Sequence, residues 1–479
     1  MDFLSDIPPA AIFAAVVGTV VIIAGILFNL RWALASFAIM AFAASISYSI
    51  DPYTDTLIPT LFTPVQLYRN FIYMFGGGLC YLAMLAHAGK LNATSINQTG
   101  LFLIGIAVIG GAFRILNGYV EAGLLSLGLA VFSIIPLTLI VPNLLERREQ
   151  VYMLMRWVLL VMGIWIIMNT VQFLVNPGVL YPADSGRFQG LTGNPQFAAV
   201  LVSFSTVCMT WVALNDPVKI IRIFAVATAA ALAICLVWTG SRTGFGMAVI
   251  GLGIIFASRI GQLIWALPVA GIFAVVFLQF VSGEVGSLNP EQLFRTNDTR
   301  SSMWGVQIET FLANPLFGTG NPNRAGASEN SYLLAFSAFG IFMGTMVLAF
   351  MVLSGMLILK LFRNRKHEDR LGRSMSDLAM AGIAMYFAGA LLEGCIMSRV
   401  HSATVYLVIT ATIGHRLLAT RAERLAHNAE ALPESDTEAD YHEDESVYLP
   451  DSYETPQENV WDPEEDWDGD EYAEERLAY

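Results

Sequence analysis

Charged residues are scarce in this chain of 479 residues, at 14% of the sequence, whereas 55% of the residues are hydrophobic. A water-soluble protein of this length carries nearer a quarter charged residues, so a soluble globular enzyme is excluded. The apolar residues fall in blocks of about 17–25, each long enough to cross the hydrocarbon of a bilayer as a helix. Backbone groups inside lipid must be hydrogen-bonded internally, which favours helices. The sequence therefore predicts an all-α polytopic membrane protein with about 12–13 transmembrane helices.

Patterns for metal or cofactor binding are also missing. The four cysteines show neither CxxC nor metal-ligand spacing, and we interpret them as small apolar residues within helices. The loops expected on the outer side contain no DxD-like or clustered-histidine signature. We therefore expect neither a metal nor a cofactor. The first residues, MDFLSDIPP, lack the basic stretch of a cleavable signal peptide, so the first apolar block is expected to be a retained helix.

Lysine is the rarest charged residue, and its positions help to orient the chain. Basic clusters at 147–148, 219–222, 259, 360–373 and 416–424 should be cytoplasmic by the positive-inside rule, which puts the N-terminus outside and the C-terminal tail inside. The four lysines, Lys90, Lys219, Lys360 and Lys366, then fall on the predicted cytoplasmic side. Eight arginines fall on the predicted outer side: Arg69, Arg114, Arg187, Arg242, Arg295, Arg300, Arg324 and Arg399. The planar guanidinium fork binds phosphate or carboxylate in a bidentate way, although some of these side chains could instead reach the interface from within the bilayer.

The apolar blocks and the change of composition near the C-terminus divide the chain. We expect membrane helices at 10–30, 33–50, 70–88, 100–117, 120–141, 151–174, 195–213, 220–239, 243–258, 262–281, 331–358, 377–395 and 402–416. Residues 1–149 would form N-terminal membrane helices, 150–400 the catalytic region, and 401–427 the last membrane helix and a basic end. Residues 428–479 are predicted to be a disordered acidic tail, because from Glu430 onward the chain has 20 acidic residues and one basic residue.

Two long outer loops and one tight turn carry most of the polar residues. The loops are 176–194 and 282–330, and loops of this length are uncommon unless they are functional. Within the second loop, Trp304, Ile308 and Phe311 recur at helical spacing, which predicts a short interfacial helix over 301–312. The turn TGSRTG at 239–244 places Arg242 at the membrane boundary, where a cation is costly unless it meets a counter-charge.

These pieces occur in a characteristic order. Along the chain they are RFQG at 187–190, GNP at 193–195, TGSR at 239–242, Arg300 and Trp304, NP at 314–315, GTG at 318–320 and ENSYL at 329–333. Over about residues 150–400, this order resembles the O-antigen ligase and O-antigen polymerase family. The resemblance implies a membrane glycosyltransferase of the GT-C type. It would transfer a glycan from an undecaprenyl-diphosphate carrier, without a metal, to lipid A-core or to a growing chain.

The resemblance also implies roles for particular residues. Arg187 and Arg242 match the family arginines held to engage the diphosphate, and Arg300 could assist them. Where many ligases have His-Asn, this chain has Glu329 and Asn330, so the base would be a carboxylate here or lie elsewhere. This departure favours an exopolysaccharide polymerase or a divergent ligase. The expected substrate-binding residues are Arg300, Arg324, Asn330, Trp304 and His401.

Each assignment has an alternative. Arg242 could pair with Glu121 or Glu393 of another helix instead of binding an anion. Glu329 could be a helix-start carboxylate that the macrodipole stabilises. Asp184 and Glu309 are other candidate acids. The rival classes are a transporter or flippase for an anionic lipid-linked glycan and a non-catalytic scaffold of a polysaccharide assembly complex. The tail could be a solubilising segment or dock to a basic cytoplasmic partner.

Overall fold

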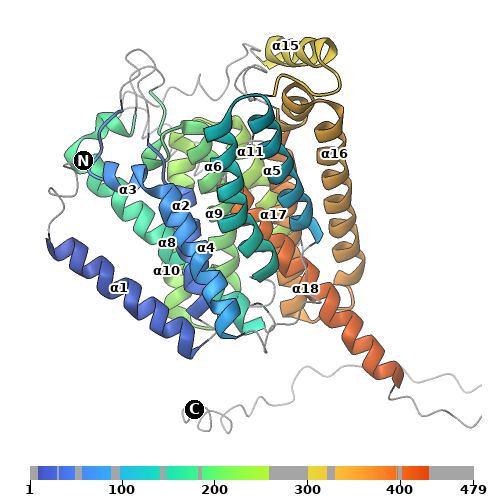
Figure 1. The fold of residues 1–479 in the computed structure, drawn as a ribbon. Helices are drawn as coiled ribbons and strands as arrows, with labels where there is room; N and C mark the ends of the chain where they lie inside the picture. Colours follow the sequence, from blue (N-terminus) through green and yellow to red (C-terminus); the bar gives the residue numbers. More distant parts are fainter. Residues whose placement is uncertain are drawn as a thin grey trace, which may run out of the picture. The chain divides into compact units, whose positions relative to one another are not determined.

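The chain is described from a computed structural model, which defines residues 9–29, 32–48, 57–87, 98–140, 145, 148–181, 186–257, 300–320, 330–394, 396 and 402–430. These residues are helical with short connections (Figure 1). Residues 1–426 form one compact unit, and residues 427–479 form a second. The predicted tail and the predicted helix at 262–281 lie outside the described residues.

The helices follow the predicted apolar blocks closely. They are α1 (Pro9–Phe28), α2 (Ala33–Ser45), α3 (Thr63–Leu67), α4 (Arg69–Ala86), α5 (Gln98–Leu116), α6 (Val120–Leu129), the π-helical η4 (Ala130–Ile134) and η5 (Pro136–Ile140), α8 (Arg148–Val175), the 3₁₀ helices η6 (Pro177–Val179) and η7 (Gly190–Thr192), α9 (Pro195–Asn215), α10 (Lys219–Trp238), α11 (Arg242–Phe256), α15 (Arg300–Ala313), α16 (Ser331–Arg365), α17 (Arg370–Ala390) and α18 (Ser402–Glu430).

Seven helical segments of the described chain are long and apolar enough to cross a membrane. They are Gln98–Leu116, Val120–Ile140, Arg148–Val175, Pro195–Asn215, Lys219–Trp238, Ser331–Arg365 and Ser402–Ala422. Shorter apolar helices occur at Val17–Phe28, Ala33–Ser45 and Arg242–Phe256. The protein is therefore an all-α polytopic membrane protein, as the composition predicts.

One end of the helix bundle is held together by ion pairs. Arg156 of α8 binds the buried Asp216, which follows α9, through two bonds of 2.9 and 3.0 Å. Arg365 of α16 binds the buried Asp377 of α17 at 2.8 Å. Lys219 begins α10 beside this end. We call it the basic end, and it also holds Lys360, Lys366, Arg370 and Arg373.

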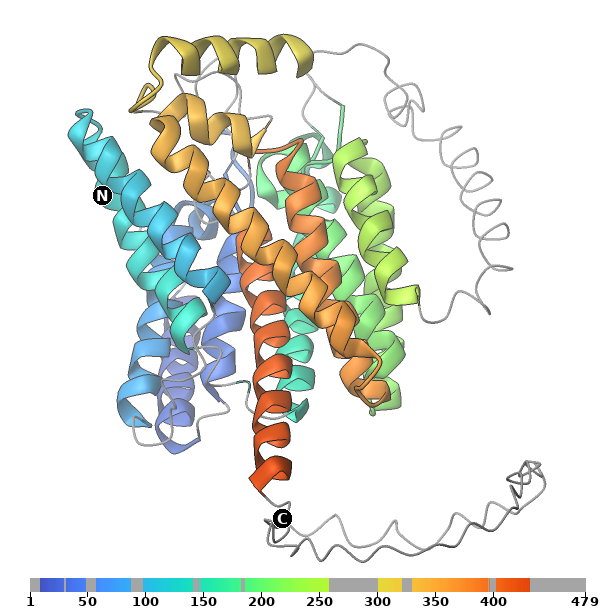
Figure 2. The same ribbon diagram turned by 90° about the vertical axis from the view of Figure 1, so that its right-hand side faces the viewer.

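The opposite end, which we call the loop end, contains the ends of α8 and α10 and the starts of α9, α11, α16 and α18. Helix α15 lies across this end, beside the start of α16 (Figure 2). Its Phe311 packs edge-to-face on Phe336 of α16, with ring centroids 5.3 Å apart. The helix predicted over 301–312 is thus present, one residue longer at each end.

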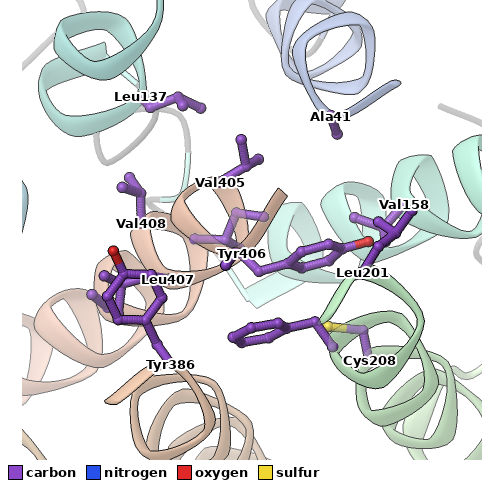
Figure 3. Packing of buried hydrophobic residues seen from close by; sticks show 14 of the residues in the cluster. Ala41, Leu137, Val158, Leu201, Cys208, Tyr386, Val405, Tyr406, Leu407 and Val408 are labelled. Atoms are coloured by element: carbon purple, nitrogen blue, oxygen red, sulfur yellow. The ribbon is translucent and has the colours of Figure 1, made fainter. Parts of the chain in front are cut away.

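Helix α18 fills the centre of the bundle. Its side chains Val405, Leu407 and Val408 are buried, as Figure 3 shows. The ring of Tyr406 stacks on Phe204 of α9 at 5.5 Å, and its hydroxyl hydrogen-bonds to Ser205 at 2.7 Å. A polar group in an apolar core needs such a partner, so Ser205 fixes the position of α18 against α9.

Helix α16 is broken at Gly340, whose φ of +75° and ψ of −168° are not helical. The backbone groups released by the break bind the segment 315–320, which follows α15. Thr319 N donates to Ser337 O (3.1 Å), Gly320 N donates to Ala338 O (2.7 Å), and Ile341 N donates to Pro315 O (2.8 Å). Buried backbone must be hydrogen-bonded inside a membrane protein. These three backbone hydrogen bonds, which we call the clasp, meet that requirement.

Candidate functional site

The end of α10 at the loop end joins the segments that carry the two predicted phosphate-binding arginines. Arg187 Nε donates to Thr239 O at 2.6 Å, and the next residue, Phe188, donates from its backbone to Trp238 O at 3.0 Å. The loop at 186–194 is therefore bonded to the turn that leads directly into Arg242. Both arginines belong to one corner of the loop end, although they lie more than fifty residues apart in the sequence.

The motif RFQG at 187–190 fixes this loop, each residue in a different way. Phe188 is buried against Trp165, Tyr181 and Trp238, with ring centroids 5.5–6.3 Å away. Gln189 closes the loop on itself by donating from its side chain to Val179 O at 2.9 Å. Burial raises the pKa of the Tyr181 hydroxyl above its ordinary value.

Gly190 lies where only glycine fits. Its φ is +53°, and a Cβ there would lie 2.7 Å from Asn169 Oδ1. Asn169 belongs to α8 and accepts a hydrogen bond from Leu191 N at 3.0 Å. Leu191 O in turn accepts from Ser47 N at 2.8 Å, which ties the loop to the end of α2. The amide of Asn169 was not predicted as a site residue, although a polar residue inside an apolar block is a usable signal.

The turn 239–244 has a compact geometry that presents Arg242 at the first position of α11. Gly240 has a φ of +56°, and Ser241 Oγ caps the helix by accepting from Gly244 N at 3.2 Å. Gly244 packs against α9 so closely that a Cβ would lie 2.7 Å from the Cβ of Ala199. Small residues therefore fix the start of α11, while the Arg242 side chain is exposed.

The start of α16 forms the other side of the loop end. Asn330 is buried, and its Oδ1 accepts from Tyr332 N and Leu333 N at 2.9 and 3.0 Å, as an N-cap. Ser331 Oγ donates to Glu393 O at 2.6 Å and accepts from Ile396 N at 3.1 Å. The cap gives Asn330 a structural role that sequence reasoning did not assign, beside the predicted contact with substrate.

Helix α15 turns a mixed polar and aromatic face towards the bundle. Gln307 is 1% exposed, and the buried indole N–H of Trp304 meets no hydrogen-bond acceptor among the described residues. Arg300 begins the helix. The remaining predicted site residues, Glu329, Arg324 and His401, lie outside the described residues. Within the part of the chain that is described, no group of three or more His, Cys, Asp or Glu side chains could hold a metal ion.

One known protein family matches the segment that contains the turn 239–244, helix α15 and the break in α16. The O-antigen ligase family model matches residues 227–342. We call residues 227–342, which are similar to this family, the O-antigen ligase segment. This confirms the resemblance found in the sequence. The O-antigen ligase segment covers about a quarter of the chain; it includes Arg242, Trp304 and Gly340 but not Arg187. A search of curated proteins gives no match for the chain.

Proposed function

We propose that the protein is a metal-independent glycosyltransferase that transfers or polymerises undecaprenyl-diphosphate-linked glycan units at the outer face of the bacterial inner membrane. The observation that carries the proposal is the bond from Arg187 to the turn that presents Arg242. It supports a site with two guanidinium groups at one corner of the bundle, inside a chain with an O-antigen ligase segment. The acceptor would be another glycan chain or lipid A-core.

The reaction requires charge stabilisation on the leaving diphosphate. As the bond between the anomeric carbon and the phosphate oxygen breaks, negative charge grows on the diphosphate, and Arg187 and Arg242, with Arg300, would stabilise it. Fixed guanidinium groups in a poorly hydrated site can supply the electrostatic stabilisation that a metal ion supplies elsewhere. Glu329 would take the proton of the acceptor hydroxyl, with Asn330 beside it. Arg324, Trp304 and His401 would contact the glycan.

The distribution of lysine supports the proposed orientation. Lys219, Lys360 and Lys366 lie at the basic end, whereas the described part of the loop end holds Arg69, Arg114, Arg187 and Arg242 but no lysine. By the positive-inside rule, the basic end would face the cytoplasm, and the tail with it. The loop end would then face the periplasm, where α15 would lie at the membrane interface. The tail would be available to a basic cytoplasmic partner.

A transporter would use freed backbone groups of a broken helix to bind its substrate. The break at Gly340 is the feature of this chain that favours that reading. However, Ser337 O, Ala338 O and Ile341 N at the break are all bonded to the segment 315–320. The break therefore supports a structural clasp, and an enzyme remains the better proposal.

Reconstitution tests the function directly. The purified protein in liposomes, supplied with undecaprenyl-diphosphate-linked repeat units, is expected to form longer glycans, or lipid A-core adducts when that acceptor is added. Chelation with EDTA should leave the rate within about twofold, because guanidinium groups rather than a metal stabilise the leaving group. Gel analysis of labelled glycan measures both. Movement of the lipid across the bilayer without any new glycosidic bond would instead identify a transporter.

The base is tested by one substitution. Glu329→Gln removes the proton acceptor but keeps the shape of the side chain, so turnover should fall by about 10²–10⁴-fold with little change in donor binding. Steady-state rates at saturating donor, together with donor titration, separate the two quantities. An unchanged turnover number would transfer the role to His401 or leave it with no single residue.

A further inference from the structure

The loop 186–194 carries Arg187 but has little regular structure of its own. Within these residues the backbone forms one helix, the three-residue η7, so bonds to other elements must set where the loop lies. Arg187 Nε and Phe188 N attach the first part of the loop to the end of α10. The position of Arg187 therefore also depends on what holds the second part.

The second part of the loop is held at Leu191, which is completely buried. Its backbone N–H donates to Asn169 Oδ1 of α8 at 3.0 Å. Its carbonyl accepts from Ser47 N at 2.8 Å and from Gln66 Nε2 of α3 at 3.3 Å. Two buried side-chain amides, from segments that are far apart in the sequence, thus bind the two backbone groups of one residue, four positions after Arg187.

Other hydrogen bonds fix both amides in turn. Asn169 Nδ2 donates to Trp165 O, one turn earlier on α8, at 2.8 Å. Gln66 Oε1 accepts from Thr60 Oγ1 at 2.7 Å, and its Nε2 also donates to Ser47 O at 2.8 Å. A buried amide whose oxygen and nitrogen are both bonded has one favourable orientation. The two amides therefore form a rigid attachment for Leu191.

Asn169 can be compared with a second asparagine that makes the same bond within its own helix. Asn215 Nδ2 of α9 donates to Trp211 O at 2.8 Å, as Asn169 Nδ2 does to Trp165 O. Asn215 ends α9 at the basic end, about 30 Å of helical rise from the start of α9 at the loop end. The bond to the loop distinguishes Asn169 from this matched residue.

We propose that Asn169 and Gln66 are positioning residues for Arg187: their amides hold Leu191 and thereby set the place of the loop from which the Arg187 guanidinium reaches the diphosphate. They act through Arg187 and need not touch the substrate. This inference rests on the proposed transferase function. It adds to the site two residues that lie outside the O-antigen ligase segment.

The first test replaces one amide by an apolar side chain of similar size. Asn169→Leu leaves Leu191 N without its acceptor, so the loop should shift. The turnover number at saturating donor and acceptor should fall at least about tenfold, because a displacement of about 1 Å in a group that acts on the transition state can cost about 10²-fold. The KM for the acceptor should change less than about twofold, because the acceptor does not bind Arg187.

The second test repeats the substitution in an Arg187→Lys background, which separates positioning from general destabilisation. A lysine ammonium is a point charge on a flexible stem and depends less on where the backbone lies than a planar guanidinium does. Asn169→Leu should therefore lower turnover less than about threefold in that background. Poorer folding alone would lower turnover by the same factor in both backgrounds, because effects without coupling add as free energies.

Asn215→Leu is the control and should change turnover less than about twofold in either background. An unchanged turnover number in folded Asn169→Leu would overturn the inference, as would equal losses in the two backgrounds. If Asn169→Leu does not give monodisperse protein, Gln66→Leu is judged by the same comparison. A wild-type protein that forms no product would refute the transferase function itself, whereas equal losses in an active protein would refute the positioning role alone.

Discussion

Alanine in place of Arg187 or of Arg242 is expected to lower glycan transfer by at least about a hundredfold, the usual cost of losing one group that stabilises the charge of a transition state. Each guanidinium would contact the diphosphate most strongly as the leaving group develops its charge. Surface glycan in a deletion strain complemented with each variant measures the effect, together with the transfer rate of the purified protein.

Three comparisons separate this chemistry from a structural effect. Arg363→Ala removes an exposed arginine of α16 at the basic end and should leave transfer unchanged. Lysine at 187 or 242 keeps the charge but loses the planar fork, so activity should be intermediate. Because Arg187 also donates to Thr239 O, its alanine variant must be compared with wild type for thermal stability in detergent. Normal glycan levels in both alanine variants would rule out the proposed site.

Gly340→Ala is expected to disrupt the fold of the loop end. A Cβ at this position would lie 2.1 Å from Leu316 O, and the φ of +75° with an extended ψ is a conformation that is essentially restricted to glycine. The backbone strain alone costs about 1–3 kcal/mol, and overpacking adds a similar amount. The fraction of monodisperse protein and its melting temperature should both fall clearly.

Gly355→Ala is the matched control on the same helix. A Cβ at Gly355 would meet nothing within 4 Å, and alanine favours a helix more than glycine does. Melting curves of the two variants in detergent should therefore diverge, with Gly355→Ala equal to wild type or slightly above it. Equal melting temperatures for Gly340→Ala and wild type would mean that α16 is not broken there.

The membrane helices could be predicted because burial in lipid demands long apolar blocks. The boundaries differ where polar turns extend a helix beyond its apolar block. Helix α17 begins at Arg370 rather than at 377, because Asp369 caps a polar first stretch that contains Arg373. Helix α18 continues to Glu430 rather than ending at 416. Neither extension contains the continuous apolar sequence on which the predictions were based.

The site was only partly predictable, since contacts between distant segments leave little trace in one sequence. The motif around Arg187 and the turn before Arg242 could be recognised, but not the bond that joins them. The break at Gly340 interrupts a run that remains apolar on both sides, and glycine is common in membrane helices. The bridge from Ser331 to Glu393 joins residues 62 positions apart, and a serine in an apolar context does not reveal its partner.

The clasp at Gly340 couples α15 to the first nine residues of α16, so that the two segments should move together. The three backbone bonds connect the end of α15 to the break, so a force that displaced α15 along the membrane surface would also tilt the start of α16. The remainder of α16 lies beyond the break at Gly340, so it need not tilt with the start of the helix. Seating of a large glycan against α15 would thus be transmitted to Asn330 and Ser331 without deforming the bundle.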